Sequence, residues 1–346
     1  GGFIFMKNKC CIILAAGEGK RMKSDKPKVL SEVLFKPMLK WVIDAALASN
    51  IDDICVVSGY KHEIVEDYIN KMNIKCDNVI QHERKGTAHA VIMAKDFLNK
   101  HKGGDVLILG GDAPFIDPNT INMAYKQHIE EKNSVTVISA NLSDPFGYGR
   151  IVRDSNLKLS KIIEQKDADE SIRSIKEVNS GAYWFNIDAL VSVLSDVKNN
   201  NAQGEYYLPD TIKLLLNEGC NVNAYVSNNF EIVLGANDSN QLHGLNKIAR
   251  DNIIKKFISD GVSIPCDDSI IIGCDVKISK GTTILPSTII MGDSSIGANC
   301  VLGPNTQIIN STVDDNTRIN SSVCVNSMIS SNKNIGPFEV LKDVKN

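Results

Sequence analysis

Three features that would each point to a particular class of protein are missing from this chain of 346 residues. There is no excess of charge, because 38 lysines and arginines face 41 acidic residues and the net charge is -3. This leaves no general electrostatic reason to expect a nucleic-acid or membrane partner. No apolar run reaches the length of a membrane span. The nine cysteines form no CxxC pair. Scattered and odd in number, they indicate reduced thiols in a cytoplasmic protein, with a disulfide framework or a zinc site as the alternative.

The chain is long enough for about two domains. It opens with Gly1–Phe5 ahead of Met6, a stretch that is too short and too little charged for a signal peptide. We expect these five residues to be foreign to the protein.

The first region, from Lys9 to about Val226, alternates short β-rich runs with helical patterns. Such alternation is typical of an α/β domain with a mainly parallel sheet. The expected strands are residues 10–14, 53–58, 78–81 and 105–110, with 134–142 and 181–185 as extensions of the sheet. Residues 37–49 place their aliphatic side chains on one face of a helix. A second, polar-faced helix from Ser239 to about Asp260 could link two domains.

The last region carries an aliphatic residue at every sixth position. The series is Ile272, Ile278, Ile284, Ile290, Ile296, Leu302 and Ile308, then Val313, Ile319 and Val325 after one slip, then Ile329, Ile335 and Leu341 after a second. A period of six fits neither a helix nor an alternating strand. It does fit a β-helix in which each flat face takes six residues and points one aliphatic side chain inward. An ordinary β-sandwich with accidental spacing is the alternative.

A cationic loop with two glycines follows the first expected strand, in the stretch LAAGEGKRMKSDKPKVL (14–30). Backbone N–H groups in such a loop converge on an anion, and Gly17 and Gly19 leave room for phosphate oxygens. The loop lacks the third glycine of a dinucleotide fingerprint and the spacing of a P-loop, so a tight turn with solvated lysines is the alternative. Arg21, Lys26 and Lys28 favour the phosphate site, because fixed cations stabilise the charge that accumulates when a triphosphate loses pyrophosphate.

This stretch resembles the signature of sugar-1-phosphate nucleotidylyltransferases. The closest resemblance is to the bacterial N-acetylglucosamine-1-phosphate uridylyltransferases, the N-terminal half of the bifunctional GlmU family. The resemblance continues in family order through QHERKGTAHAV, GGDAPFI, GYGRIVR, IIEQKDA, EVNSGAYWF, NNAQGEYYLPD and GANDSNQL. It covers nearly the whole chain, the six-residue repeats included.

The resemblance implies a fold and a reaction. The fold is α/β: a Rossmann-like nucleotidyltransferase domain with a mainly parallel sheet (6–238), a linker helix (239–261) and a short left-handed parallel β-helix (262–346). The reaction is transfer of the uridylyl group of UTP to N-acetylglucosamine-1-phosphate, a Mg²⁺-dependent in-line displacement that releases pyrophosphate. Its product, UDP-N-acetylglucosamine, serves the synthesis of cell-wall peptidoglycan.

The resemblance also assigns roles to individual positions. For the nucleotide they are Ala15, Gly17 and Gly19 in the phosphate loop, Arg21 and Lys28 as catalytic cations, and Gln81, Gly86 and Thr87 around the base. For Mg²⁺ they are Asp112 and Asn237, and for the sugar Gly149, Glu164 and Asn179. Without the resemblance, the alternatives are an exposed residue at a strand end for Gln81, a turn or cap residue for Asp112, and ordinary strand residues for the sugar set.

Two further expectations concern the repeats. In the family, the β-helix continues further and carries an acetyltransferase site with a catalytic histidine, whereas the last histidine of this sequence is His243. We therefore expect no acetyl transfer by this polypeptide. The family is trimeric through this element, so we expect a homotrimer, with a capped monomer as the alternative. The alternative functions are a related enzyme for glucose-1-phosphate or another nucleoside triphosphate, and a non-catalytic regulatory relative.

Overall fold

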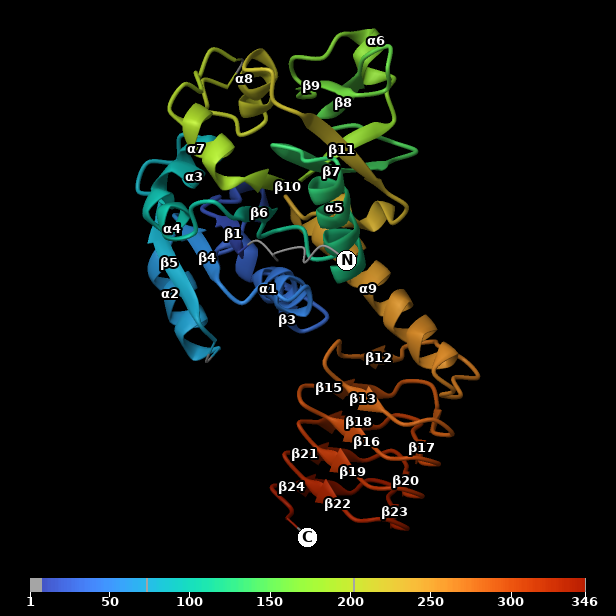
Figure 1. Ribbon diagram of the computed structural model, residues 1–346. Helices are drawn as coiled ribbons and strands as arrows, with labels where there is room; N and C mark the ends of the chain where they lie inside the picture. The colour runs from blue at the N-terminus through green and yellow to red at the C-terminus, as the bar shows by residue number, and fades with distance from the viewer. Residues whose placement is uncertain (1–7, 73, 202, 346) are drawn as a thin grey trace, which may run out of the picture. The chain divides into compact units, whose positions relative to one another are not determined.

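The computed structural model describes residues 8–72, 74–201 and 203–345 (Figure 1). Within these residues the chain divides into two compact units, the first made of 8–31 and 37–241 and the second of 32–36 and 242–345. The five leading residues and the expected domain start at Met6 lie outside the described residues. The boundaries at 238/239 and 261/262 stay a prediction.

A nine-stranded sheet forms the centre of the first unit. In chain order its strands are β1 (Lys9–Ala15), β4 (Ile54–Ser58), β5 (Cys76–Ile80), β6 (Asp105–Gly110), β7 (Val135–Asn141), β8 (Arg150–Arg153), β9 (Leu159–Ile163), β10 (Glu177–Asn186) and β11 (Val222–Ser227). In space the order is β11-β7-β10-β6-β1-β4-β5, and the β8–β9 hairpin pairs with β10. Strand β10 runs antiparallel to β6 and β7, while β6, β1, β4 and β5 are parallel to one another. The sheet is mainly parallel, as predicted.

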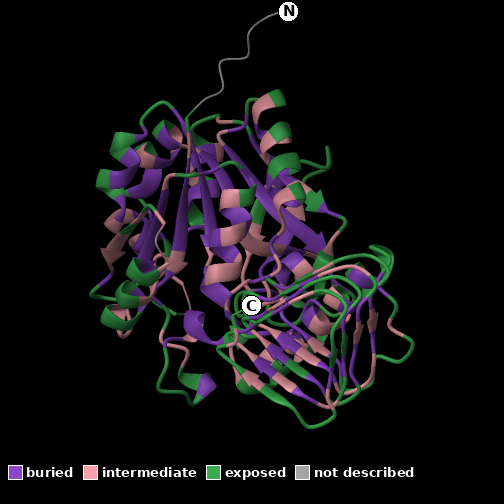
Figure 2. Ribbon diagram, turned by 90° about the horizontal axis from the view of Figure 1, so that it is seen from below, coloured by how far each residue is buried: buried purple, intermediate pink, exposed green. Residues whose placement is uncertain are grey.

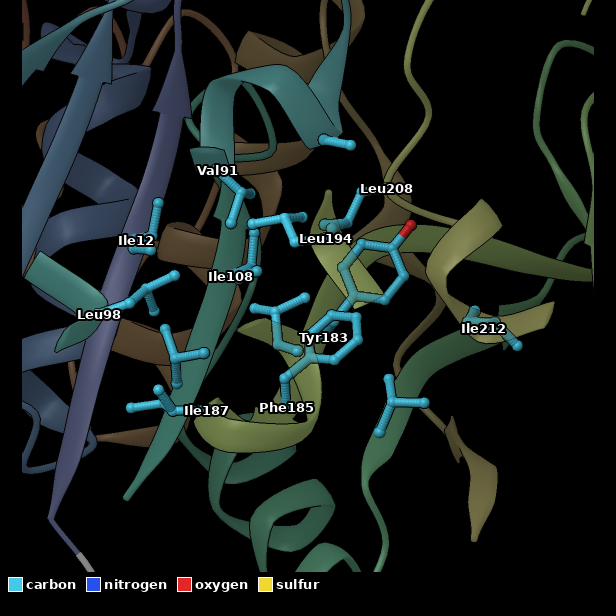
Figure 3. Packing of buried hydrophobic residues seen from close by; sticks show 14 of the residues in the cluster. Ile12, Val91, Leu98, Ile108, Tyr183, Phe185, Ile187, Leu194, Leu208 and Ile212 are labelled. Carbon is cyan, nitrogen blue, oxygen red and sulfur yellow. The ribbon is translucent and has the colours of Figure 1, made fainter. Parts of the chain in front are cut away.

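Helices cover both faces of this sheet because successive residues of its central strands point to opposite sides. Ile12 of β1 packs with Val91 and Leu98 in one core (Figure 3), and Ile13 packs with Val42 in the other. The strands are buried, while the helices keep exposed residues on their outer sides (Figure 2). On the Ile12 side lie α3 (Thr87–Met93), α4 (Lys95–Lys100), α7 (Ile187–Leu194) and α8 (Asp210–Asn217). On the Ile13 side lie α1 (Met38–Ala48), α2 (His62–Lys71) and α5 (Pro118–Glu130).

Short helical turns complete the first unit at the ends of its strands. They are η1 (Lys20–Met22), η2 (Lys28–Leu30), α6 (Glu170–Arg173) and η3 (Phe230–Val233). Both η1 and η2 follow β1, so the cationic stretch folds as two tight turns and leaves its glycines outside regular structure.

The second unit begins with a hairpin and a helix. Strands β2 (Glu32–Val33) and β3 (Lys36–Pro37) are joined by a turn in which Leu34 and Phe35 both have positive φ, 45° and 66°. The Leu34 N–H donates to Oδ1 of Asn246, at 2.9 Å, on helix α9 (Ser239–Ser259). Among the described residues no helix is long and apolar enough to cross a membrane.

Short parallel strands of this unit form three sheets that run along a β-helix. The first sheet holds β12 (Ile271–Ile272), β15 (Ile289–Met291), β18 (Gln307–Ile309), β21 (Val323–Val325) and β24 (Val340–Lys342). The second holds β13 (Lys277–Ile278), β16 (Ser295–Ile296), β19 (Thr312–Val313) and β22 (Met328–Ile329). The third holds β14 (Thr283–Ile284), β17 (Val301–Leu302), β20 (Arg318–Ile319) and β23 (Asn334–Ile335). This is the predicted left-handed parallel β-helix rather than a sandwich.

The repeat predicted its interior with one error. Ile290 and Ile308 are fully buried, but Val325 is only partly buried and does not point into the core. Its place is taken by Cys324, which is fully buried and aligns with Ile308 and Leu341. The prediction of Val325 was wrong because the spacing shortens to five residues before Cys324 as well as after it, and a small apolar thiol fills the position as an aliphatic would.

Candidate active site

A pocket of about 740 Å³ opens in the first unit where parallel strands of the sheet end. Its walls include Gly17 after β1, Gln81 after β5 and Asp112 after β6. Open α/β sheets bind their ligands at this carboxyl edge, because the loops that follow adjacent strands converge there. Of the predicted nucleotide and metal residues, those that line this pocket are Gly17, Lys28, Gln81, Gly86, Thr87 and Asp112, whereas Ala15, Gly19, Arg21 and Asn237 do not.

The loop after β1 is shaped by Gly19. This residue has φ of +65°, and a Cβ there would lie 2.7 Å from the Cβ of Lys28. No non-glycine residue would leave room for the lysine stem. Ala15 is buried at the end of β1, whereas Gly17 is exposed, and a Cβ there would have no neighbour within 4 Å. Gly17 therefore exposes its backbone to the pocket, and Gly19 leaves room for the side chain of Lys28.

Lys28 connects the two predicted metal ligands. Its ammonium group donates to Oδ1 of Asn237 at 2.9 Å and forms an ion pair with Oδ2 of Asp112. The Lys28 side chain is only 12% exposed, which strengthens these contacts relative to a surface pair. A Cβ at Gly235 would lie 2.9 Å from the carbonyl oxygen of Asp112, so that glycine allows the segment carrying Asn237 to approach. A carboxylate oxygen and an amide oxygen thus converge on one cation.

The loop after β5 is closed by Gln81, whose side chain and backbone are both bonded within the protein. Its N–H donates to the carbonyl of Ser58 at 2.7 Å, and its Nε2 lies 3.0 Å from the carbonyl of Gly86 and 2.9 Å from Nδ1 of His89. Burial, followed by Lys85, lowers the pKa of His89, which favours a neutral ring whose Nδ1 can accept from the amide. Gln81 is 3% exposed and borders the pocket from behind this loop.

Gly86 and Thr87 adjoin Gln81 at the start of α3. Gly86 has φ of +109°, and a Cβ there would lie 2.5 Å from the carbonyl oxygen of Tyr206. The Thr87 hydroxyl accepts from the N–H of Leu208 at 2.9 Å. Both residues line the pocket, so the structure brings the three predicted base contacts together.

The three predicted sugar residues also meet. The N–H of Asn179 donates to the carbonyl of Gly149 at 2.9 Å, and a Cβ at Gly149 would lie 2.9 Å from Oε1 of Glu164. Burial raises the pKa of Glu164, Asp167 and Asp210 raise it further, and Arg150 opposes them. None of the three lines the pocket in the structure, but Ser180 and Gly181, which follow Asn179, do. The predicted sugar set therefore adjoins the same cavity.

Arg21 lies apart from the other predicted residues, while Glu18 and Arg84 were not predicted. Arg21 is exposed, does not line the pocket, and its side chain has no hydrogen bond or ion pair with any other described residue. Glu18 and Arg84 both line it, and the Arg84 guanidinium donates to the Glu18 carboxylate at 3.0 Å. The only signal in the sequence was opposite charge in two of the family segments.

Comparisons with known proteins show the family to which the chain belongs. A family model described as nucleotidyl transferase matches residues 10–232. The bifunctional protein GlmU of Caldanaerobacter subterraneus is 41% identical over 333 residues, which cover 96% of this chain and 72% of that protein. The GlmU of Clostridium beijerinckii is 42% identical over 334 residues, with the same coverage.

A solved structure supports the fold alone. It is a crystal structure from Bacillus anthracis, described as a putative glucose-1-phosphate thymidylyltransferase in complex with sucrose, and it superposes with a TM-score of 0.57 at 21% identity. The superposition covers 70% of this chain and 96% of that one. The family model and the sequence relatives show that the chain belongs to the nucleotidyl transferase family and, within it, to the family of bifunctional GlmU proteins.

Proposed function

We propose that this chain transfers the uridylyl group of UTP to N-acetylglucosamine-1-phosphate, giving UDP-N-acetylglucosamine and pyrophosphate. The observation that carries the proposal is the shared pocket. Its walls bring together the glycine loop, Lys28 with Asp112, and the loop from Gln81 to Thr87, and Asn237 contacts Lys28 beside them. Membership of the GlmU family supports this substrate pair.

The proposed roles of the loop residues and of the two cations follow from their charge and hydrogen-bonding groups. Backbone amides of the loop at Ala15, Gly17 and Gly19 would bind the triphosphate, as anions bind where N–H groups converge. The sugar phosphate is already an anion, so its oxygen can attack the α-phosphorus without a general base. Lys28, with Arg21, would stabilise the negative charge that passes to the departing pyrophosphate. The Lys28 ammonium group is held in place by the Asn237 amide oxygen and the Asp112 carboxylate.

The substrate specificity would come from the two other groups of residues. The loop at Gln81, Gly86 and Thr87 would contact the uracil, and the Gly86 backbone can approach a ligand closely because it carries no side chain. Glu164 and Asn179 would hold the hydroxyl groups of N-acetylglucosamine, with Gly149 leaving space beside them. A carboxylate and an amide suit vicinal hydroxyls because they accept and donate hydrogen bonds, respectively.

The oxygen donors fit Mg²⁺. Asp112 and Asn237 both reach a single cation, the Lys28 ammonium, and carboxylate and amide oxygens suit a hard divalent ion. Within residues 8–72, 74–201 and 203–345, no group of three or more His, Cys, Asp or Glu could hold a metal. Mg²⁺ commonly takes only one or two protein ligands and completes its shell with water and phosphate oxygens. When bound, it would supply charge neutralisation at the phosphates.

We further propose a homotrimer in the cytoplasm. The first β-helix sheet turns outward a row of apolar residues that are only partly buried, among them Ile289, Met291, Ile309 and Val325. Contact with other copies would cover this row. All nine cysteines are free, which supports a reducing compartment.

The decisive experiment measures pyrophosphate release with a panel of nucleoside triphosphates and sugar-1-phosphates. We expect the highest kcat/KM with UTP and N-acetylglucosamine-1-phosphate, and none without Mg²⁺. A higher kcat/KM with glucose-1-phosphate or with another triphosphate would replace the proposed substrates. Absence of release with every pair would indicate a non-catalytic protein.

A further inference from the structure

An ion pair joins the two loops to which the proposed function assigns the phosphates and the base. Glu18 stands between Gly17 and Gly19 in the first loop, and Arg84 precedes Gly86 by two residues in the second. Arg84 Nη2 lies 3.0 Å from Oε2 of Glu18. Both side chains line the 740 Å³ pocket, so the pair spans part of its wall.

Arg84 is held by a second contact that also leads back to the glycine loop. Its guanidinium carbon lies 5.8 Å from the centre of the Tyr60 ring, within reach of a cation–π interaction. The N–H of Tyr60 donates to the carbonyl of Ala16 at 3.2 Å, and a Cβ at Gly59 would lie 2.8 Å from that of Ala16. The backbone of Tyr60 is therefore bonded to the backbone beside Gly17. Both partners of Arg84 belong to, or are tied to, the same loop.

A carboxylate at position 18 is unfavourable for a triphosphate site unless a cation accompanies it. Glu18 is 28% exposed, and like charges at close range repel more strongly where water is partly excluded. The other cation near it is Lys20, at 3.8 Å and with a side chain 80% exposed. Arg84 is thus the nearer cation, and it comes from the opposite loop.

We propose that Arg84 and Glu18 are a positioning pair for the nucleotide. Arg84 cancels the charge of Glu18 and holds the glycine loop against the base loop, at the separation that a bound nucleoside triphosphate needs. The pair acts on triphosphate binding rather than on the sugar phosphate. The identity of the nucleotide rests on the proposed function.

The test is a double-mutant cycle with Glu18→Gln, Arg84→Gln and the double variant, read through the KM for UTP and the KM for N-acetylglucosamine-1-phosphate. Partly exposed ion pairs contribute up to about 1 kcal/mol, so we expect Arg84→Gln to raise the KM for UTP roughly fivefold. Adding Glu18→Gln should bring it back to the value of Glu18→Gln alone, because the unpaired carboxylate is gone. The KM for the sugar phosphate should change less than twofold.

Lys61→Gln is the matched control, since it removes the other cation over Tyr60, whose Nζ lies 5.5 Å from the ring centre. It should leave the KM for UTP unchanged. The proposal is overturned if Arg84→Gln has no effect, or if it raises the KM equally in both backgrounds, which would mean that Arg84 binds the nucleotide directly. An equal rise in the KM for the sugar phosphate would point to a general structural defect and would also overturn it.

Titration calorimetry separates this proposal from the proposed function. It measures binding of the triphosphate that the wild type binds most tightly, without any sugar phosphate. Coupling between positions 18 and 84 in that affinity supports the pair even if no UDP-N-acetylglucosamine is formed. Normal turnover without such coupling refutes the pair and leaves the proposed function intact.

Discussion

The pocket depends on residues that have no equivalent elsewhere in the chain, whereas the β-helix repeats one interior position along its coils. Gly19, Gly86 and Gly149 each face a different neighbour that a Cβ would meet within 2.9 Å. In the β-helix the same inward position is filled by Ile308 and by Cys324, and both are fully buried. The pocket depends on individual residues, whereas the β-helix depends on a repeated pattern of inward apolar residues. Single substitutions should therefore remove activity in the first unit and stability in the second.

The largest expected effect is at Lys28. Lys28→Ala should lower kcat for pyrophosphate release by about 10² to 10³, because it removes a preorganised charge at the departing group. Its melting temperature should stay near that of the wild type. Lys20→Ala is the control, since its side chain is 80% exposed, and it should be mild. Equal losses at both positions would contradict the special role of Lys28.

The converse effect is expected in the β-helix. Ile308→Ala leaves a cavity in a fully buried interior position and should lower the stability of the unit by about 2–5 kcal/mol. Below the unfolding temperature, the KM for UTP should not change. Hydrogen exchange of the intact chain would show the loss in β18 and its neighbours. Val323→Ala, at a partly buried position of the same sheet, should cost less, and an equal cost would contradict the inward assignment.

A smaller effect on stability is expected when a residue with positive φ is replaced by glycine, and it should differ between the hairpin turn and the β-helix. Phe35 has φ of 66° and is 44% exposed, and a left-handed conformation costs a non-glycine residue about 1–2 kcal/mol. Phe35→Gly should therefore raise the free energy of unfolding by about 1 kcal/mol, partly offset by the greater freedom of glycine in the unfolded chain. Asn316, with φ of 58°, is of a type that tolerates this conformation. Asn316→Gly should be nearly neutral in the same thermal melts, and a gain as large as that of Phe35→Gly would refute the explanation.

The smallest effect concerns acid stability. The hydrogen bond from Lys75 lowers the pKa of Asp53 below its usual 3.8, burial opposes this shift, and His101 adds to it. A lowered carboxyl pKa stabilises the folded state above the unfolded value and loses that contribution as the pH falls through the folded value. Between about pH 5 and 2.5, the melting temperature of Asp53→Asn should fall less steeply than that of the wild type. Lys75→Gln should behave in the same direction, and an unchanged slope in both would contradict the linkage.

The fold was largely predictable because its signals are local. The strand runs and the six-residue repeat each reflect the period of the structure that they form. The error at Val325 arose where the spacing shortens to five residues, because the inward residue there is a cysteine and the series counted only aliphatic residues. The repeat alone could not place Cys324 inside.

The sequence named candidate site residues but not the contacts among them. Gly19 was assigned to the phosphates, while its structural reason, the stem of Lys28, appears only in three dimensions. The bond from Lys28 to Asn237 joins positions 209 residues apart, and the bond from Arg84 to Glu18 joins positions 66 apart. Sequence spacing carries no information about such pairs, because they form only when separate strands place their loops at one edge.

The account rests on Lys28 and Asp112 acting as one cluster, and a double-mutant cycle on pyrophosphate release tests this most directly. If the two groups act together, Lys28→Ala, Asp112→Ala and the double variant should all lose a similar factor in kcat, because removing either partner already disables the cluster. Losses that multiply in the double variant, or turnover at the wild-type rate in either single variant, would contradict the account.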